Sequence, residues 1–216
     1  MAASVKKLKK DFFPMNKEII VHDNKHPLLA LLIKSKLDHY SRSEMLAQRP
    51  QVVWDFTLGT TSEKREFYQE LRSMGVQQIH ADLTSCHGSL LIKEFPELQT
   101  AFASACWSPK ESYELWQRDP EAEFGLLEIF PLQPVEVQSP GHCFTYPRVI
   151  STLINEARFA VRDGLAEVSD LDRAMKYGVN YPLGLVEWEA KIGKEIIDLI
   201  LRDLREETHS DRYQTL

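Results

Sequence analysis

Residues 155–193 read NEARFAVRDGLAEVSDLDRAMKYGVNYPLGLVEWEAKIG. Their pattern predicts a helix, a second, capped helix, and a Tyr-Pro-Leu-Gly corner that leads into a third helix. Ser169 followed by Asp170 suits the start of the second helix, because a side-chain oxygen and a negative charge both stabilise the free N–H groups there. Gly164 and Gly178 suit the left-handed positions at which helices end. The stretch therefore predicts an all-helical C-terminal region.

The composition is that of an ordinary globular protein. With 216 residues, of which 43% are hydrophobic, the chain can form one large domain or two small ones. A formal net charge of -6 argues against a nucleic-acid partner, since phosphate binding requires a positive face. No apolar run approaches the roughly 20 residues that span a bilayer, so no membrane partner is expected.

The cysteines and the N-terminus indicate the cellular setting. Cys86, Cys106 and Cys143 are too widely spaced for a disulfide framework, which favours a reducing, cytoplasmic setting. Several lysines precede residue 11 without the apolar segment that a signal peptide requires. Residues 1–14 are therefore expected to form a flexible basic tail, and the sequence leaves open whether Met1 or Met15 is the native start.

The first two thirds of the chain alternate between strand-like and helical segments, which predicts a mainly parallel sheet flanked by helices. The expected strands are Lys17–His22, Gln51–Thr57, Gln78–Thr84, Thr100–Trp107, Ser112–Gln117 and Pro134–Gln138. The expected helices are Leu28–Tyr40, Glu63–Ser73 with Ser62 as its N-cap, a short one near Leu90–Phe95, and one from Asp119-Pro120 through Phe130.

Beyond Ser139-Pro140-Gly141 the apolar residues follow helical spacing, and a last helix is expected over Leu183–Glu206. The sequence thus predicts a truncated Rossmann-like α/β domain over 15–138 and a helical domain over 139–216. The last helix carries more apolar residues than a domain of this size can easily cover, which predicts that the helical domain forms a homodimer.

Short sequence motifs in the helical part, taken together, carry a specific resemblance. They are Ser139-Pro140-Gly141, Arg148, Asn155-Glu156-Ala157, Gly164, Asp170–Met175, Gly178, Tyr181–Gly184, Ile192-Gly193 and Asp211-Arg212-Tyr213. Their order and spacing resemble the C-terminal helical domain of the 3-hydroxyacyl-CoA dehydrogenases. The resemblance implies a role in fatty-acyl-CoA metabolism, pairing of two copies through this domain, and a surface that closes over acyl-CoA.

The α/β part resembles the same family more faintly. Val52–Asp55 and Lys64–Leu71 resemble a strand of the family that ends in an acidic residue and the helix that follows it. Thr84-Ser85-Cys86 falls where the family has Asn-Thr-Ser-Ser, and Trp107-Ser108-Pro109 falls within its His-Phe-Phe-Asn-Pro. In this register Ser85 is the only catalytic position that the chain retains.

The other catalytic positions of the family are altered. The resemblance places its catalytic histidine, the base that takes the hydroxyl proton, at Ala105. It places the carboxylate that orients this histidine at Gln117, with Glu114 as the nearest acid. Neither Ala105 nor Ser108, which falls at the asparagine that follows the histidine in the family, can replace an imidazole that titrates near neutral pH. If a site has been rebuilt, its candidate residues are Ser85, Glu114 and His142.

The cofactor signature is also absent after the first expected strand. A dinucleotide fold requires Gly-x-Gly-x-x-Gly there, so that the backbone can approach the pyrophosphate. This chain has Asp-Asn-Lys-His-Pro. No cofactor-binding residue is therefore assigned, and NAD is implied only if the family activity is retained.

No metal site is expected from the sequence. In the family's fold the loops with Cys86-His87, Cys106 and His142-Cys143 would converge on the active-site cleft, and cysteine and histidine are zinc ligands. However, their spacings match no zinc motif.

Three functions remain open. The chain is a degenerate 3-hydroxyacyl-CoA dehydrogenase relative that keeps dimerisation and acyl-CoA binding, or an active oxidoreductase or acyl-CoA enzyme with a rebuilt site, or an interaction module that pairs with itself or with a full-length dehydrogenase. The first is favoured, because both the base and the phosphate loop are altered.

Overall fold

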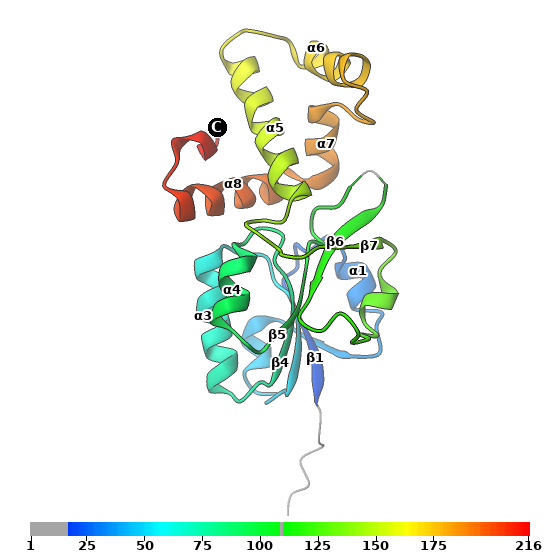
Figure 1. Cartoon of the computed structure of the whole chain (residues 1–216), viewed down its shortest axis with the longest axis vertical. Coiled ribbons are helices and arrows are strands. Elements are labelled where there is room, and N and C mark those ends of the chain that lie inside the picture. Colours follow the sequence, from blue (N-terminus) through cyan, green and yellow to red (C-terminus); the bar gives the residue numbers. More distant parts are fainter. Residues whose placement is uncertain (1–16, 109) are drawn as a thin grey trace, which may run out of the picture.

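The computed structural model describes residues 17–108 and 110–216, and it contains a sheet region below a cluster of helices (Figure 1). The expected basic tail, with Met1 and Met15, lies outside the described residues. No helix within the described part of the chain is both long and apolar enough to cross a membrane.

The sheet has seven strands in the order β2-β1-β3-β4-β5-β6-β7. Neighbouring strands are parallel except for β5 and β6, which confirms the prediction of a mainly parallel sheet. The strands are β1 (Glu18–His22), β2 (Asp38–Tyr40), β3 (Val52–Phe56), β4 (Gln78–Asp82), β5 (Leu98–Phe102), β6 (Ser112–Gln117) and β7 (Gln133–Glu136). The central strands are buried on both faces because helices and loops cover them.

The helices of the sheet region are α1 (Leu29–Leu32), α2 (Arg42–Met45), α3 (Thr61–Ser73) and α4 (Gly88–Glu94), with a 3-10 turn at Leu127–Ile129. Thr60, not the expected Ser62, is the N-cap of α3, where its hydroxyl and the Glu63 carboxylate form a capping box. Gly75 follows the helix with φ of 83°, a conformation that glycine adopts without strain. The apolar face of α3 packs Phe67, Tyr68 and Leu71 against the sheet.

Two helices expected in this region are wrong. Residues 28–40 form one helical turn and the short edge strand β2. Ser35 contributes to this break, because its hydroxyl accepts a hydrogen bond from the Leu37 N–H and so competes with helix continuation. Residues 120–130 form turns, because Asp119 accepts the Glu121 N–H and Gly125 weakens helix propagation.

The helical region consists of α5 (Tyr146–Arg162), α6 (Val168–Arg173), a π-helical turn (Ala174–Gly178), α7 (Leu185–Ile192), α8 (Lys194–Thr208) and a 3-10 turn (Asp211–Tyr213). The expected single helix over 183–206 is wrong, because Gly193 takes φ of 100° and divides it. Gly164 takes the expected left-handed conformation, whereas Gly178 does not, and Glu167 precedes α6 in place of Ser169.

The apolar residues of α7 and α8 are covered within the chain itself. Trp188, Ile197, Ile200 and Leu204 pack with Ile150 and other residues of α5 in one buried cluster. Most of the apolar surface from which dimerisation was inferred is therefore buried within the chain, whereas Ile192 and Leu199 are half-buried.

Candidate functional site

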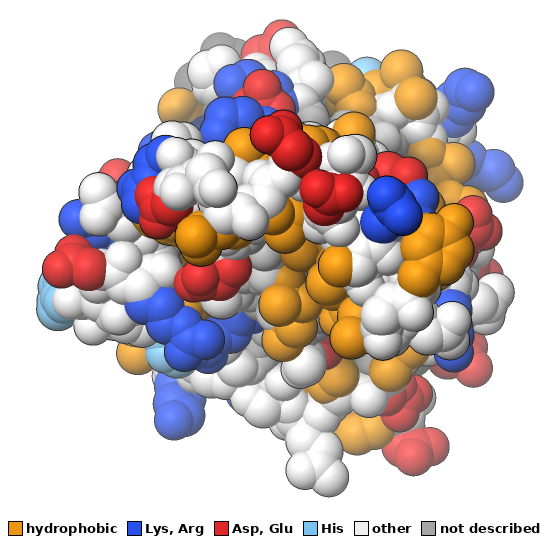
Figure 2. Space-filling model, turned by 90° about the horizontal axis from the view of Figure 1, so that it is seen from above, with side chains coloured by type: hydrophobic (Ala, Val, Ile, Leu, Met, Phe, Trp, Pro, Cys, Tyr) orange, Lys and Arg blue, Asp and Glu red, His pale blue; other side chains and the backbone are white. Residues whose placement is uncertain are grey.

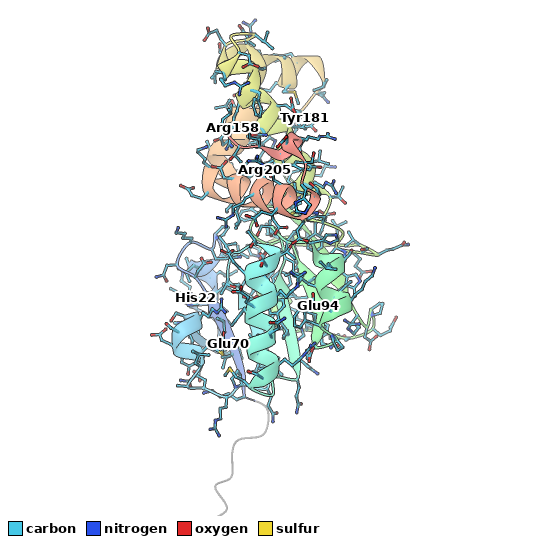
Figure 3. All side chains as sticks on the ribbon, turned by 90° about the vertical axis from the view of Figure 1, so that its left-hand side faces the viewer. His22, Glu70, Glu94, Arg158, Tyr181 and Arg205 are labelled. Atoms are coloured by element: carbon cyan, nitrogen blue, oxygen red, sulfur yellow. The ribbon has the colours of Figure 1, made fainter. Side chains whose placement is uncertain are left out.

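The strand order reverses at β1, because β2 lies on one side of it and β3 on the other. In open α/β sheets such a switch point is where ligands bind, outside the carboxyl ends of the strands. A pocket of about 730 Å³ opens there. Its lining includes His22 at the end of β1 and Asp23 after it, Ser41 and Arg42 after β2, and Glu70 on α3. Figure 3 shows His22 and Glu70 on this side of the sheet region.

The residues of this pocket do not fit the pyrophosphate of NAD. The turn from His22 to Pro27 has no glycine, and α1 is a single turn that offers no extended helix N-terminus. The Asp23 carboxylate lies in the crevice, where it accepts hydrogen bonds from the Leu58 N–H at 2.5 Å and the Lys25 N–H at 2.8 Å. A carboxylate that already uses the local donors would repel a phosphate.

A buried ion pair supports the floor of the pocket. Lys64 on α3 contacts the Asp55 carboxylate of β3 at 2.5 Å, and both side chains are at most 1% exposed. The Tyr68 hydroxyl donates to the same carboxylate at 2.8 Å, and burial together with Asp55 raises the pKa of Tyr68. Thr57 donates to the second Asp55 oxygen. Lys64 is therefore held as a structural cation and is not free for a ligand.

The position given to the family's catalytic histidine is closed. Ala105 is 1% exposed, and its N–H donates to the Thr84 hydroxyl at 3.2 Å. The cavity beside it measures about 20 Å³, too small for a substrate, and is walled by Pro27, Ala105, Cys106, Trp107, Trp188, Lys191 and Ile192. Trp188 belongs to α7, so the helical region itself fills this space.

His26, to which no role was assigned from sequence, is hydrogen-bonded beside Ala105, at the neighbouring residue Ser104. His26 Nε2 is 3.1 Å from Asp82 Oδ2, and the Ser104 hydroxyl donates to the same oxygen at 2.5 Å. His26 Nδ1 accepts the Leu28 N–H, so Nε2 carries the proton and donates to Asp82. All three side chains are buried, so the group fastens the β1–α1 turn to the sheet and offers no accessible base.

The three candidate site residues are not brought together by hydrogen bonds. The Ser85 hydroxyl donates to the Gly59 carbonyl at 2.7 Å. Glu114 accepts the N–H groups of Thr145 and Tyr146 at the start of α5, where a carboxylate stabilises the positive end of a helix. His142 contacts Asp203. Ser85 and Glu114 thus make structural bonds, and their catalytic roles stay predictions.

His142 belongs to a buried group that we name the His142 cluster, made of His142, Cys143 and Asp203. His142 Nε2 is 2.9 Å from Asp203 Oδ2, and the ligand atoms of the three side chains lie within 4.8 Å of one another. Asp203 also accepts the N–H and the hydroxyl of Thr61 at the start of α3. The cluster therefore joins α8 to the sheet region.

The predicted convergence of the cysteine and histidine loops is observed in part. The Cys143 N–H donates to the Cys86 carbonyl at 2.7 Å, and the rings of His87 and His142 stack with centroids 4.6 Å apart. Burial lowers the pKa of His87, and His142 adds to this shift. Burial raises the pKa of the Cys143 thiol, and Asp203 raises it further.

Asp203 was missed in the sequence, although a signal exists. It falls three residues after Ile200 on the apolar stripe of α8, where a carboxylate needs a partner because burial of an isolated charge is costly. Its partner Thr61 is 142 residues away, so the pairing itself was not visible.

The helical region matches a known family. Residues 144–216 match the model of the 3-hydroxyacyl-CoA dehydrogenase C-terminal domain. The 3-hydroxyadipyl-CoA dehydrogenase of Escherichia coli (strain K12) is 39% identical over 67 residues, which cover 31% of this chain and 14% of the relative. The 3-hydroxybutyryl-CoA dehydrogenase of Clostridioides difficile is 36% identical over 91 residues, which cover 42% of this chain and 32% of the relative. The matched segments thus span a third of these relatives or less.

Solved structures show a similar fold. FadB2 of M. tuberculosis aligns with a TM-score of 0.59 at 18% identity, covering 83% of this chain and 67% of that one. The (S)-3-hydroxybutyryl-CoA dehydrogenase PaaH1 from Ralstonia eutropha aligns with a TM-score of 0.53 at 18% identity, covering 83% and 66%. The predicted order, a Rossmann-like sheet followed by a helical domain, is confirmed. The match over residues 144–216 confirms the predicted resemblance of the helical region to the 3-hydroxyacyl-CoA dehydrogenases.

Proposed function

We propose that this chain is a degenerate relative of the 3-hydroxyacyl-CoA dehydrogenases of fatty-acyl-CoA metabolism, which has lost NAD-linked catalysis and acts through its helical domain. The observation that carries the proposal is the closed space around Ala105. Ala105 cannot take a proton from a hydroxyl, and about 20 Å³ holds no more than a water molecule. The Asp23 carboxylate in the cofactor crevice supports the same conclusion.

The test is the consumption of NADH with acetoacetyl-CoA, with a His142→Ala variant measured beside the native chain. Loss of a general base alone costs about 10²–10⁴-fold in rate. We expect no turnover above the buffer background for either protein. Turnover of several per second in the native chain that is abolished in the variant would show a rebuilt active site, and would overturn the proposal.

The retained function that we propose is pairing through the helical domain. Three of its apolar side chains, Leu165, Tyr177 and Val179, are 78%, 84% and 60% exposed. Figure 2, which looks down on this end of the molecule, shows hydrophobic side chains gathered in the middle of the face with charged ones around them. Exposed apolar surface of this kind is typical of an interaction site.

An apolar pocket in the same domain supports a second retained property, the binding of an acyl group. It measures about 470 Å³ and lies between α5, α6 and α7. Its lining is mainly apolar, with Ile154, Ala157, Val161, Val168, Leu185, Val186 and Leu216 beside Arg158, Arg162 and Glu189. A pocket of this size suits a small apolar ligand.

Light scattering and thermal shifts separate these two properties. A Tyr177→Asp variant is expected to be monomeric where the native chain is a dimer, while Val135→Asp on β7, which is 48% exposed in the native chain, is the matched control. A monomeric native chain at micromolar concentration would contradict pairing. A panel of CoA, acetoacetyl-CoA, NADH and NADPH tests binding, since a ligand of the native state raises the Tm by mass action. An unchanged Tm with all four compounds would leave only the interaction role.

A further inference from the structure

From the His142 cluster we infer a metal site for one divalent transition-metal ion, zinc by its donor set, with His142, Cys143 and Asp203 as ligands. The inference does not depend on the loss of dehydrogenase activity. Imidazole nitrogen, thiolate sulfur and carboxylate oxygen are the three donor types that bind zinc in proteins. Here one of each is buried within 4.8 Å of the other two.

The three ligand atoms lie within 4.8 Å of one another, so closing them onto one ion requires shifts of about 1 Å or less. Bonds of about 2.0–2.3 Å to zinc place neighbouring ligand atoms about 3.3–3.7 Å apart. His142 Nε2 and Asp203 Oδ2 are 2.9 Å apart, so these two atoms need to separate by only about 0.5 Å to admit the ion. Three protein ligands leave a fourth position for water, and His142, at 8% exposure, lies nearest to solvent.

Charge balance also favours a divalent ion. Asp203 is completely buried, and its bonds come from the Thr61 N–H, the Thr61 hydroxyl and the His142 ring. A dication with one carboxylate, one thiolate and one neutral imidazole forms a site with no net charge, which reduces the cost of burial. When the ion binds, the Cys143 thiol releases its proton to solvent, and sulfur forms the bond to the metal.

Hydrogen bonds from neighbouring residues fix the positions of the Asp203 carboxylate and the Cys143 backbone. Thr61 fixes the Asp203 carboxylate through both of its oxygens, and such bonds orient a ligand and tune its affinity. Cys143 has φ of 60° and Phe144 φ of 53°, two consecutive left-handed residues without glycine. Strain of this kind persists where the surroundings impose it, and it clusters at functional sites. The bond from the Cys143 N–H to the Cys86 carbonyl contributes to holding this turn.

The experiment is a titration of the full native chain with Co²⁺, followed by absorption, and a measurement of zinc content after dialysis. We expect about one equivalent of zinc, and a thiolate-to-cobalt charge-transfer band. Cys143→Ser should remove the band, whereas Cys106→Ser, which changes another buried cysteine outside the cluster, should leave it unchanged. Thr61→Val should weaken zinc binding about 10–100-fold, because it removes the hydroxyl bond to Asp203.

Two results would overturn the inference. One is a folded native chain, shown by its circular dichroism, that takes up neither zinc nor cobalt. The other is a charge-transfer band that survives in Cys143→Ser, because the sulfur ligand would then be a different cysteine. Since the first result is read on the native protein, it does not depend on whether the variants fold.

Discussion

Replacing Lys64 by methionine is expected to be among the most damaging single changes in the sheet region. The substitution keeps an unbranched side chain, shorter by one heavy atom, and removes the ammonium group, so that the Asp55 carboxylate stays buried without its ion-pair partner. Removal of one member of a buried pair costs about 3–5 kcal/mol. Because the Tyr68 and Thr57 hydroxyls still donate to Asp55, we expect the lower end, about 3 kcal/mol.

The measurement is urea unfolding followed by the fluorescence of tryptophan, since Trp54 precedes Asp55 on β3. With a slope of about 3 kcal/mol per molar urea, the midpoint should fall by about 1 M. The double variant Asp55→Asn/Lys64→Met should recover most of the loss, because no charge stays buried. Arg65→Met, which removes a cation from an exposed pair on the same helix, is the matched control and should cost less than about 1 kcal/mol. A Lys64→Met variant as stable as this control would refute the reasoning.

Three further predictions concern other parts of the fold. Burial lowers the pKa of His80 to about 4, so as the pH falls the unfolded state binds a proton before the folded state does. The free energy of unfolding should therefore fall by about 3 kcal/mol between pH 6.5 and pH 4. The fall should be smaller in His80→Gln when unfolding is measured across that range. Gly88→Ala would place a methyl group 2.7 Å from Pro140 and should lower the Tm, whereas Gly125→Ala, with no neighbour within 4 Å, is the control that should not. Arg158→Met removes contacts at 2.8 and 2.5 Å to two carboxylates and should cost about 1–3 kcal/mol by calorimetry; an unchanged Tm would contradict it.

Local patterns were enough to predict the architecture of the chain. The alternation of strands and helices indicated the parallel sheet, because each strand is a short apolar run between turn residues. The short sequence motifs of the helical part indicated the resemblance to the family, because their order and spacing are specific in combination. These features are read within a few tens of residues, so no knowledge of long-range contacts was required.

The features that sequence did not predict depend on distant partners. The strand β2 has only three residues, Asp38–Tyr40, and exists because the edge of β1 pairs with it. Asp203 and Thr61 meet only when the helical region folds onto the sheet. His26 reaches Asp82 across 56 residues. Each of these contacts sets the shape of the candidate site, which explains why the site was harder to predict than the fold.

Two carboxylates join the sheet region and the helical region, one from each. Asp203 of the helical region accepts the first N–H of α3, and Glu114 of the sheet region accepts the first N–H groups of α5. Each region thus supplies a carboxylate that accepts N–H groups at the start of a helix in the other region. Because these bonds join the two regions, we expect the regions to unfold together in a single cooperative transition.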